Sequence, residues 1–198
     1  MRLNELIGIK NHPIGKAASE IKPAGVFDKV FSSYDPGSME NLKDILRGYG
    51  WRDAGFGYYG MVFKHHQYPY VVKVFVADTA YAEYFNIIKD NQDNPHVPKV
   101  RGNFMRVGDR GYAVRLEKLD PLFNQRDPIF KKYIDPRLPQ AFPSIFYENN
   151  EQHLKRFWPK LYDLYQQIEG IGGVQLDMHI RNVMSRGDTL VITDPVAL

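Results

Sequence analysis

The sequence contains no cysteine, no long block of like charges and no apolar run of membrane-spanning length. Without cysteine the chain has neither disulfides nor thiolate chemistry, which fits a reducing compartment. The N-terminus lacks a signal-peptide hydrophobic region, and a membrane span would need about 20 consecutive apolar residues. The formal net charge of +3 is too small to indicate nucleic-acid binding. We therefore expect a soluble, cytoplasmic protein with no membrane partner and no specific nucleic-acid partner.

What is present is an ordinary globular composition, with 43% apolar and 25% charged residues in a chain of 198. That length suffices for one medium domain or two small lobes with a buried core. Residues 1–37 are interrupted by proline and glycine, and their role stays open. A helix is predicted next, with an apolar face made of Met39, Leu42, Ile45 and Leu46.

Three oxygen-bearing side chains near the C-terminus frame a predicted hairpin. Asp177 is followed five residues later by Asn182 and, twelve residues beyond that, by Asp194. The segment between the last two predicts two short strands joined by a turn at residues 185–188. Two facing oxygen ligands suit Mg²⁺, which also binds substrate phosphates, and Asp177 would remain to accept a proton. The alternative is a hairpin edge in which Asp and Asn only form turns.

This spacing resembles the catalytic loop and the metal-binding aspartate of the protein-kinase superfamily. The form Asp177-x-His179-x-x-Asn182, with Asp194-Pro195 after the strand, is similar to the aminoglycoside-kinase-like branch. The segment also resembles the early-gene Ser/Thr protein kinases of lytic podophages. The resemblance implies that Asp177 is the catalytic base and that Asn182 and Asp194 bind the metal. His179 would either assist in the catalytic loop or serve as a packed scaffold residue.

A second candidate site begins with three glycines. Gly55, Gly57 and Gly60 fit G-x-G-x-x-G and precede a predicted strand. Glycine lets backbone N–H groups approach phosphate because no Cβ is in the way. A dinucleotide-binding fingerprint would need a helix after the glycines, so the context favours the phosphate-covering loop of a kinase. The alternative is a glycine-rich hairpin bend without a ligand.

The strand predicted at residues 70–76 carries Lys73 within a continuous apolar run. Such a run indicates that the strand is buried on both faces, where a charged lysine is rare unless it has a partner or a function. In a kinase the strand lysine binds the nucleotide phosphates and pairs with a glutamate of a neighbouring helix. The alternative is an edge lysine that reaches water. A helix is predicted at residues 79–89, and its single glutamate, Glu83, is either the partner of Lys73 or an exposed residue.

Two more strands are predicted at residues 100–105 and 111–116. In a kinase the segment after them is the linker between the lobes, so Glu117 and Leu119 would offer backbone groups to adenine. The proline-rich region from Asp120 to about Asn150 is either a docking surface or an insertion packed by aromatic residues, with a short helix near residues 129–133. A helix is predicted at about residues 151–169, with Phe157 on its apolar face, to brace the catalytic loop. Pro159 either kinks this helix or marks its true start, because a proline inside a helix costs a hydrogen bond.

The order of these signals predicts an α+β, minimal two-lobed protein-kinase-like fold. Its antiparallel-sheet N-lobe would span residues 51–119, after an N-terminal extension and helix at 1–50. A truncated, mostly helical C-lobe would span residues 120–198. The resemblance implies an ATP- and Mg²⁺-dependent phosphotransferase, a phage-encoded Ser/Thr protein kinase acting on host proteins, with ATP and Mg²⁺ as cofactors.

Two other functions stay open: a catalytically inactive kinase-like protein that inhibits a host target, and a small-molecule kinase. The sequence ends at Leu198, four residues after Asp194, which leaves no room for an activation loop or a peptide-docking segment. Such a chain would act as a minimal kinase, would bind substrate through a homodimer, or would be shortened at its C-terminus. For the host partner the phage resemblance implies transcription machinery, which no residue supports independently.

Overall fold

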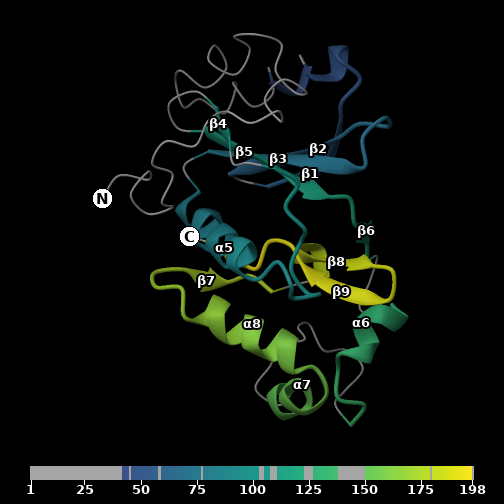
Figure 1. Ribbon diagram of the computed structural model, residues 1–198, viewed down its shortest axis with the longest axis vertical. Coiled ribbons are helices and arrows are strands. Elements are labelled where there is room, and N and C mark those ends of the chain that lie inside the picture. The colour runs from purple at the N-terminus through teal and green to yellow at the C-terminus, as the bar shows by residue number, and fades with distance from the viewer. Residues whose placement is uncertain are drawn as a thin grey trace. The chain divides into compact units, whose positions relative to one another are not determined.

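The computed structural model of the chain is an α+β fold of helices and antiparallel strands (Figure 1). It describes residues 42–44, 46–57, 59–76, 78–102, 105–107, 111–122, 127–137, 150–178 and 180–197. The predicted α+β class is confirmed. The N-terminal residues 1–37, and Met39 and Ile45 of the predicted helix face, lie outside the described residues. No helix within the described ranges is long and apolar enough to cross a membrane.

The chain divides into two compact units. The first comprises Met1–Asp78 and Lys99–Lys118, and the second comprises Thr79–Pro98 and Leu119–Leu198. The lobe boundaries predicted from the sequence group residues 79–98 with the N-terminal sheet, whereas the compact units group this segment with the C-terminal part of the chain. Each unit is described by itself below.

The first unit holds a five-stranded antiparallel sheet in the order β1-β2-β3-β5-β4. Its strands are β1 (Arg52–Phe56), β2 (Gly60–Lys64), β3 (Tyr70–Val76), β4 (Met105–Val107) and β5 (Gly111–Glu117). The strands predicted at residues 70–76 and 111–116 are confirmed. The strand predicted at 100–105 is wrong in its bounds, because Val100 makes only an isolated bridge and β4 begins at Met105. Gly102, with a φ of 104°, turns the chain between them.

One face of this sheet carries the hydrophobic core of the first unit. All residues of β3 from Val72 to Val76 are buried, so the predicted burial on both faces is confirmed, and the alternate residues Val72, Val74 and Val76 belong to this core. They pack in one cluster with Leu42 and Leu46, which the sequence placed together on a helix face. Because neighbouring side chains alternate, Lys73 projects from the other face of the sheet.

Among its described residues the second unit contains four α-helices and one short 3-10 helix, η2 (Ile180–Asn182). The α-helices are α5 (Thr79–Asp90), α6 (Pro128–Lys132), α7 (Glu151–Phe157) and α8 (Pro159–Glu169). Two small antiparallel sheets accompany them. One has the order β6-β8-β9, and the other pairs β7 with β10. Their bounds are β6 (Asp120–Pro121), β7 (Gln175–Leu176), β8 (Val183–Arg186), β9 (Thr189–Ile192) and β10 (Val196–Ala197). The helix predicted at residues 79–89 is confirmed as α5.

The helix predicted at residues 151–169 divides into two at Trp158, and Pro159, the position named as a kink or a true helix start, begins α8. The Trp158 N–H donates to the Leu154 carbonyl at 2.7 Å and ends α7, and Pro159 stands in the first turn of α8. Proline lacks an N–H and fits the first turn of a helix, where no intrahelical donor is needed. Phe157 was expected on the buried face, yet it is 55% exposed.

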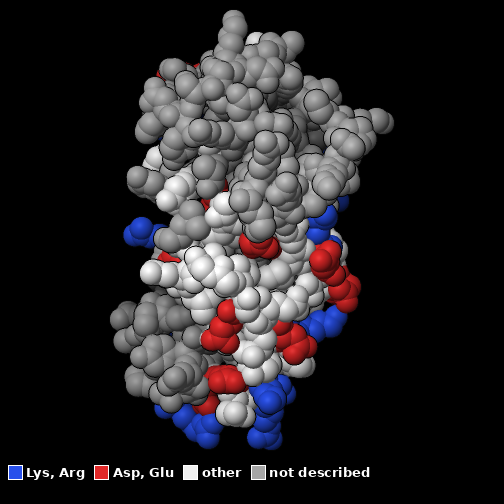
Figure 2. All heavy atoms as spheres, turned by 90° about the vertical axis from the view of Figure 1, so that its left-hand side faces the viewer, with Lys and Arg blue, Asp and Glu red and all other residues white. Residues whose placement is uncertain are grey.

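The outer side of α7 is strongly basic. Lys155 and Arg156 are exposed on it, whereas Leu154 is buried. Figure 2 shows Lys and Arg side chains gathered at the lower end of the described surface, where Figure 1 places α7. The helix is therefore amphipathic and presents its charged side to solvent.

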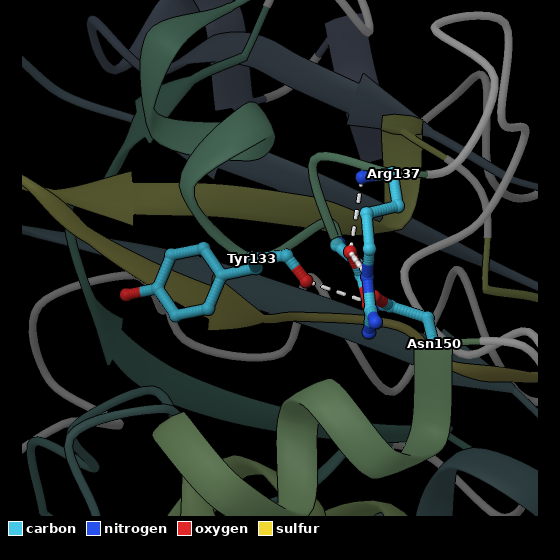
Figure 3. Close-up of polar contacts among 4 residues, drawn as sticks. Tyr133, Arg137 and Asn150 are labelled. Atoms are coloured by element: carbon cyan, nitrogen blue, oxygen red, sulfur yellow. Dashed lines mark hydrogen bonds and ion pairs between the residues drawn. The ribbon is translucent and has the colours of Figure 1, made fainter.

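The proline-rich region is anchored by Asn150, which is fully buried. Its Nδ2 donates to the Tyr133 carbonyl at 2.9 Å and its Oδ1 accepts from the Asp135 N–H at 2.8 Å (Figure 3). Hydrogen bonds from the Arg137 guanidinium hold the pKa of the Asp135 carboxyl well below its ordinary value. The predicted short helix is confirmed as α6, while Phe142 and Phe146, two of the expected packing residues, lie outside the described part of the chain.

Candidate active site

Strands β8 and β9 form the predicted hairpin, in which Val183 pairs with Ile192. The turn was predicted at residues 185–188, but Ser185 and Arg186 still pair with β9. The turn therefore consists of residues 187–188 only. Gly187 has a φ of 58°, in the left-handed region that glycine adopts without a Cβ clash. The open end of the hairpin, at Val183 and Ile192, carries the candidate site residues.

At this open end, Asn182 makes hydrogen bonds to both aspartate-bearing segments. Its side-chain Nδ2 donates to the Asp177 carbonyl at 2.6 Å. Its own carbonyl accepts from the N–H groups of Thr193 at 2.9 Å and Asp194 at 3.3 Å, and from the Thr193 hydroxyl at 2.9 Å. The structure therefore joins Asp177, Asn182 and Asp194, which the sequence singled out, in one hydrogen-bonded arrangement.

The pairing of β7 with β10 also holds Asp177 near Asp194. Asp177 directly follows β7, and its N–H donates to the Pro195 carbonyl at 2.7 Å, which continues the pairing of β7 with β10. Asp177 and Asp194 are both partly exposed, so neither carboxylate is sealed in the core. His179, the second predicted catalytic residue, lies outside the described residues.

Strand β9 is also held by residues that lie outside the hairpin. The Tyr84 hydroxyl of α5 donates to the Ile192 carbonyl at 2.8 Å, and the Ile192 N–H donates to the His96 carbonyl at 2.9 Å. The His96 Nδ1 lies 2.7 Å from the Leu190 carbonyl. Burial lowers the pKa of His96, which keeps the ring neutral, and a neutral ring can donate Nδ1–H to that carbonyl.

The loop between α5 and β4 is fastened to the hairpin by an arginine as well. Arg186 at the end of β8 donates to the carbonyls of Pro95 and Val97, at 2.8 and 2.9 Å. Asn94, which is buried, connects the same loop to α8 by donating to the Lys160 carbonyl at 2.8 Å. The candidate site thus rests on a scaffold made from three separate parts of the chain.

The donor atoms at the hairpin end fit a magnesium ion. Mg²⁺ bound together with substrate phosphates needs only one or two protein oxygens, and it prefers carboxylate and carbonyl oxygens. The bond from Nδ2 to Asp177 directs the amide so that Oδ1 is the atom Asn182 can offer, and Asp194 supplies a carboxylate. In the described part of the chain no group of three or more His, Cys, Asp or Glu side chains could hold a metal by itself.

In the first unit, the three glycines lie in the hairpin of β1 and β2. A Cβ on Gly60 would come within 2.8 Å of the Val74 carbonyl and 3.1 Å of the Phe75 Cβ. A Cβ on Gly55 or Gly57 would meet its nearest neighbour only at 3.7 or 3.9 Å, which is ordinary contact. The packing of the sheet therefore explains Gly60, but it gives no reason for glycine at the other two positions.

Lys73 shares a sheet face with this hairpin. In the strand register Gly55 is opposite Val62, Val62 is opposite Lys73, and Lys73 is opposite Val114. Directly paired residues project to the same face, so these four residues form a row across four strands. Lys73 is only 6% exposed. The register thus provides a buried cation and a glycine-bearing hairpin on the face opposite the core.

The other predicted nucleotide-binding residues have different local settings. Glu83 is partly exposed on α5, and because Lys73 belongs to the other compact unit their pairing stays a prediction. Glu117 is buried, its N–H donates to the Lys99 carbonyl at 2.9 Å, and its Oε1 accepts from the Lys99 N–H at 2.6 Å. A backbone contact of Glu117 with adenine would therefore have to use its carbonyl. Leu119 is partly exposed just after β5.

Sequence reasoning missed three residues that support the site: Tyr84, His96 and Thr193. Tyr84 was counted only as part of an apolar helix face, and His96 only as part of a loop. The available signal was chemical, since a tyrosine hydroxyl on a buried helix face needs a hydrogen-bond partner. Which carbonyl it reaches depends on contacts across 108 residues of sequence, which no local pattern encodes.

The chain was compared with known protein families. The family model described as bacteriophage T7 protein kinase 0.7 matches residues 35–198. The matched range contains every candidate site residue named above and the described parts of both compact units. No curated protein matches the chain. The family match confirms the kinase resemblance that was drawn from Asp177, Asn182 and Asp194.

Proposed function

Because the chain belongs to the bacteriophage T7 protein kinase 0.7 family, we propose that it transfers the γ-phosphoryl group of ATP, with Mg²⁺, to serine or threonine hydroxyls of host proteins. Family membership establishes the kinase class. The nucleotide, the metal and the acceptor are inferred from the candidate site and from the resemblance. We expect the reaction in the cytoplasm of the infected host cell, where host substrates would be met.

The observation that supports this proposal most strongly is the hydrogen bonding around Asn182. Phosphoryl transfer needs a carboxylate near the acceptor hydroxyl and oxygen ligands that hold a metal beside the phosphates. Asn182 fastens the Asp177 carbonyl through its side chain and the Asp194 N–H through its carbonyl. Asn182 thus holds the backbone of both the proposed base, Asp177, and the other proposed metal ligand, Asp194.

Each candidate residue has a distinct part in the proposed reaction. Asp177 would orient the acceptor hydroxyl and accept its proton, and Asn182 Oδ1 and the Asp194 carboxylate would hold the metal. When bound, Mg²⁺ supplies positive charge that neutralises the phosphate oxygens. Lys73 would bind the α- and β-phosphates, and Gly55, Gly57 and Gly60 would allow the hairpin backbone to approach them. Glu83 would orient Lys73, while His179 would support the catalytic loop.

The first test is incubation with γ-labelled ATP and Mg²⁺, alone and in host lysate. Wild type is compared with Asp177→Asn and Asp194→Asn, both checked for folding by circular dichroism. We expect label on protein with wild type only. Label on small molecules but not on protein would favour a small-molecule kinase. No label, from a folded protein that still captures a host partner, would contradict the proposal and favour an inhibitory binding protein.

A further inference from the structure

The Tyr84 hydroxyl is a buried polar group that the proposed reaction does not use directly. The side chain is fully buried on α5, and its hydroxyl donates to the Ile192 carbonyl at 2.8 Å. Ile192 is the last residue of β9 and lies two residues before Asp194. The hydrogen bond therefore acts on the backbone at the point where the strand ends and the candidate metal ligand follows.

We propose that Tyr84 is a positioning residue for Asp194, whose carboxylate it holds beside Asn182 Oδ1 by fixing the end of β9. The inference rests on the proposed function insofar as Asp194 and Asn182 are taken as the metal ligands. It adds a residue from a different helix, more than 90 residues earlier in the chain, to the group that determines the geometry of the metal site.

The backbone partners around Ile192 show why one hydroxyl can have this effect. The Ile192 N–H donates to the His96 carbonyl, and the N–H groups of Thr193 and Asp194 both donate to the Asn182 carbonyl. The Ile192 carbonyl has Tyr84 as its side-chain donor. If the hydroxyl were removed, a buried carbonyl would lose this partner, which is unfavourable unless the chain rotates toward another donor. Such a rotation would move Asp194.

Tyrosine suits this task in two ways. Burial, and secondarily the charge of Asp194, raise the pKa of Tyr84 well above its ordinary value of 10, so the hydroxyl keeps its proton at neutral pH. Its ring is also rigidly held, because it packs edge-on against Tyr81 with centroids 6.2 Å apart. The hydroxyl is therefore a fixed donor rather than a mobile one.

Tyr84→Phe tests the inference because it removes one oxygen and keeps the ring. A second tyrosine that contacts β9 provides the control. Tyr133 is buried, and its hydroxyl accepts a hydrogen bond from the N–H of Leu190 in β9 at 3.2 Å. Tyr133→Phe removes the same atom type from a contact with β9, two residues farther from Asp194. A purely structural role would affect both variants alike.

The readout is the Mg²⁺ concentration that gives half of the thermal stabilisation by ATP, measured beside phosphate transfer. We expect both variants to lose similar thermal stability without ligand. Tyr84→Phe should need about tenfold more Mg²⁺, which corresponds to about 1.4 kcal/mol, whereas Tyr133→Phe should match wild type. In transfer assays, kcat at fixed Mg²⁺ should fall for Tyr84→Phe, while KM for the protein substrate stays unchanged.

Three results would decide against parts of this account. Equal Mg²⁺ requirements in the two variants would overturn the positioning role of Tyr84. A wild-type protein that is stabilised by ATP with Mg²⁺ but transfers no phosphate would overturn the proposed activity, and the Mg²⁺ titration would still decide the role of Tyr84. A folded wild-type protein that gains no stability from ATP with Mg²⁺ would overturn both.

Discussion

The two compact units position their candidate residues by different means. In the first unit, Lys73 and Gly55 owe their places to strand register, since each is one position in a continuous antiparallel ladder. In the second unit, Asp177 and Asp194 lie just outside strands and are fixed by individual hydrogen bonds. A ladder distributes the positioning over many bonds, whereas the second arrangement depends on a few specific donors and acceptors.

This difference has a consequence for mutation. A candidate residue placed by a ladder can be changed without disturbing the backbone that presents it, provided that the new side chain does not meet the neighbouring strand, as it would at Gly60. A candidate residue that also makes the positioning bonds cannot, because its removal affects both chemistry and local structure. Activity and stability should therefore separate in the first unit and change together at Asn182.

The largest effect should come from Lys73→Met. We expect phosphate transfer to fall about 100-fold or more, because the positive charge proposed to bind the phosphates is lost. The unfolding free energy should change by no more than about 1 kcal/mol, since an apolar side chain of similar length replaces a buried cation. Labelled-ATP transfer and urea denaturation measure the two quantities. A large loss of stability would show that Lys73 is mainly a structural residue.

Asn182→Ala should lower both quantities at once. The side-chain bond to the Asp177 carbonyl and the proposed ligand oxygen disappear together, so transfer should fall to a similar degree and stability by about 1 kcal/mol. Asn182→Asp separates the two roles, because it keeps an oxygen for the metal but cannot donate to that carbonyl at neutral pH. If Asn182→Ala kept full phosphate-transfer activity, Asn182 would not be a metal ligand of the site.

Among the glycines, Gly60→Ala should destabilise the first unit by about 1–3 kcal/mol, because the added Cβ would meet the Val74 carbonyl and Phe75. Gly57→Ala is the matched control, with only ordinary contacts around the added carbon. If Gly57 serves phosphate binding, its alanine variant should keep its melting temperature and bind ATP more weakly. If Gly57→Ala bound ATP as tightly as wild type, Gly57 would serve only to form the bend of the hairpin.

The smallest effect is a pH dependence of stability from His96. Burial lowers the pKa of His96 below its ordinary value of 6.5, so the unfolded chain binds a proton that the folded protein rejects as pH falls. Above that value the ring is neutral in both states and contributes no slope. The unfolding free energy should therefore decrease as the pH falls below about 6.5, and His96→Gln should weaken this slope. Identical slopes in denaturant titrations would contradict the assignment.

Several features follow from the sequence alone because they depend on local patterns. Continuous or alternating apolar residues determined β3, β5 and α5, and the spacing of Asp177, Asn182 and Asp194 indicated the candidate site. Local patterns failed where two signals competed. The apolar periodicity at residues 151–169 extends over both helices, but Pro159 has no N–H to continue the first one, and the backbone of Trp158, with φ −135° and ψ 55°, leaves the helical conformation.

The tertiary structure alone decided how the candidate site is held together. The partners of Ile192 are Tyr84 and His96, which lie about one hundred residues earlier and carry no motif. Which buried donor meets which buried carbonyl depends on how α5 and its following loop pack against the hairpin. The sequence thus determines which atoms can do the chemistry, while packing determines the backbone positions from which they act, because hydrogen-bond partners are selected by proximity in space.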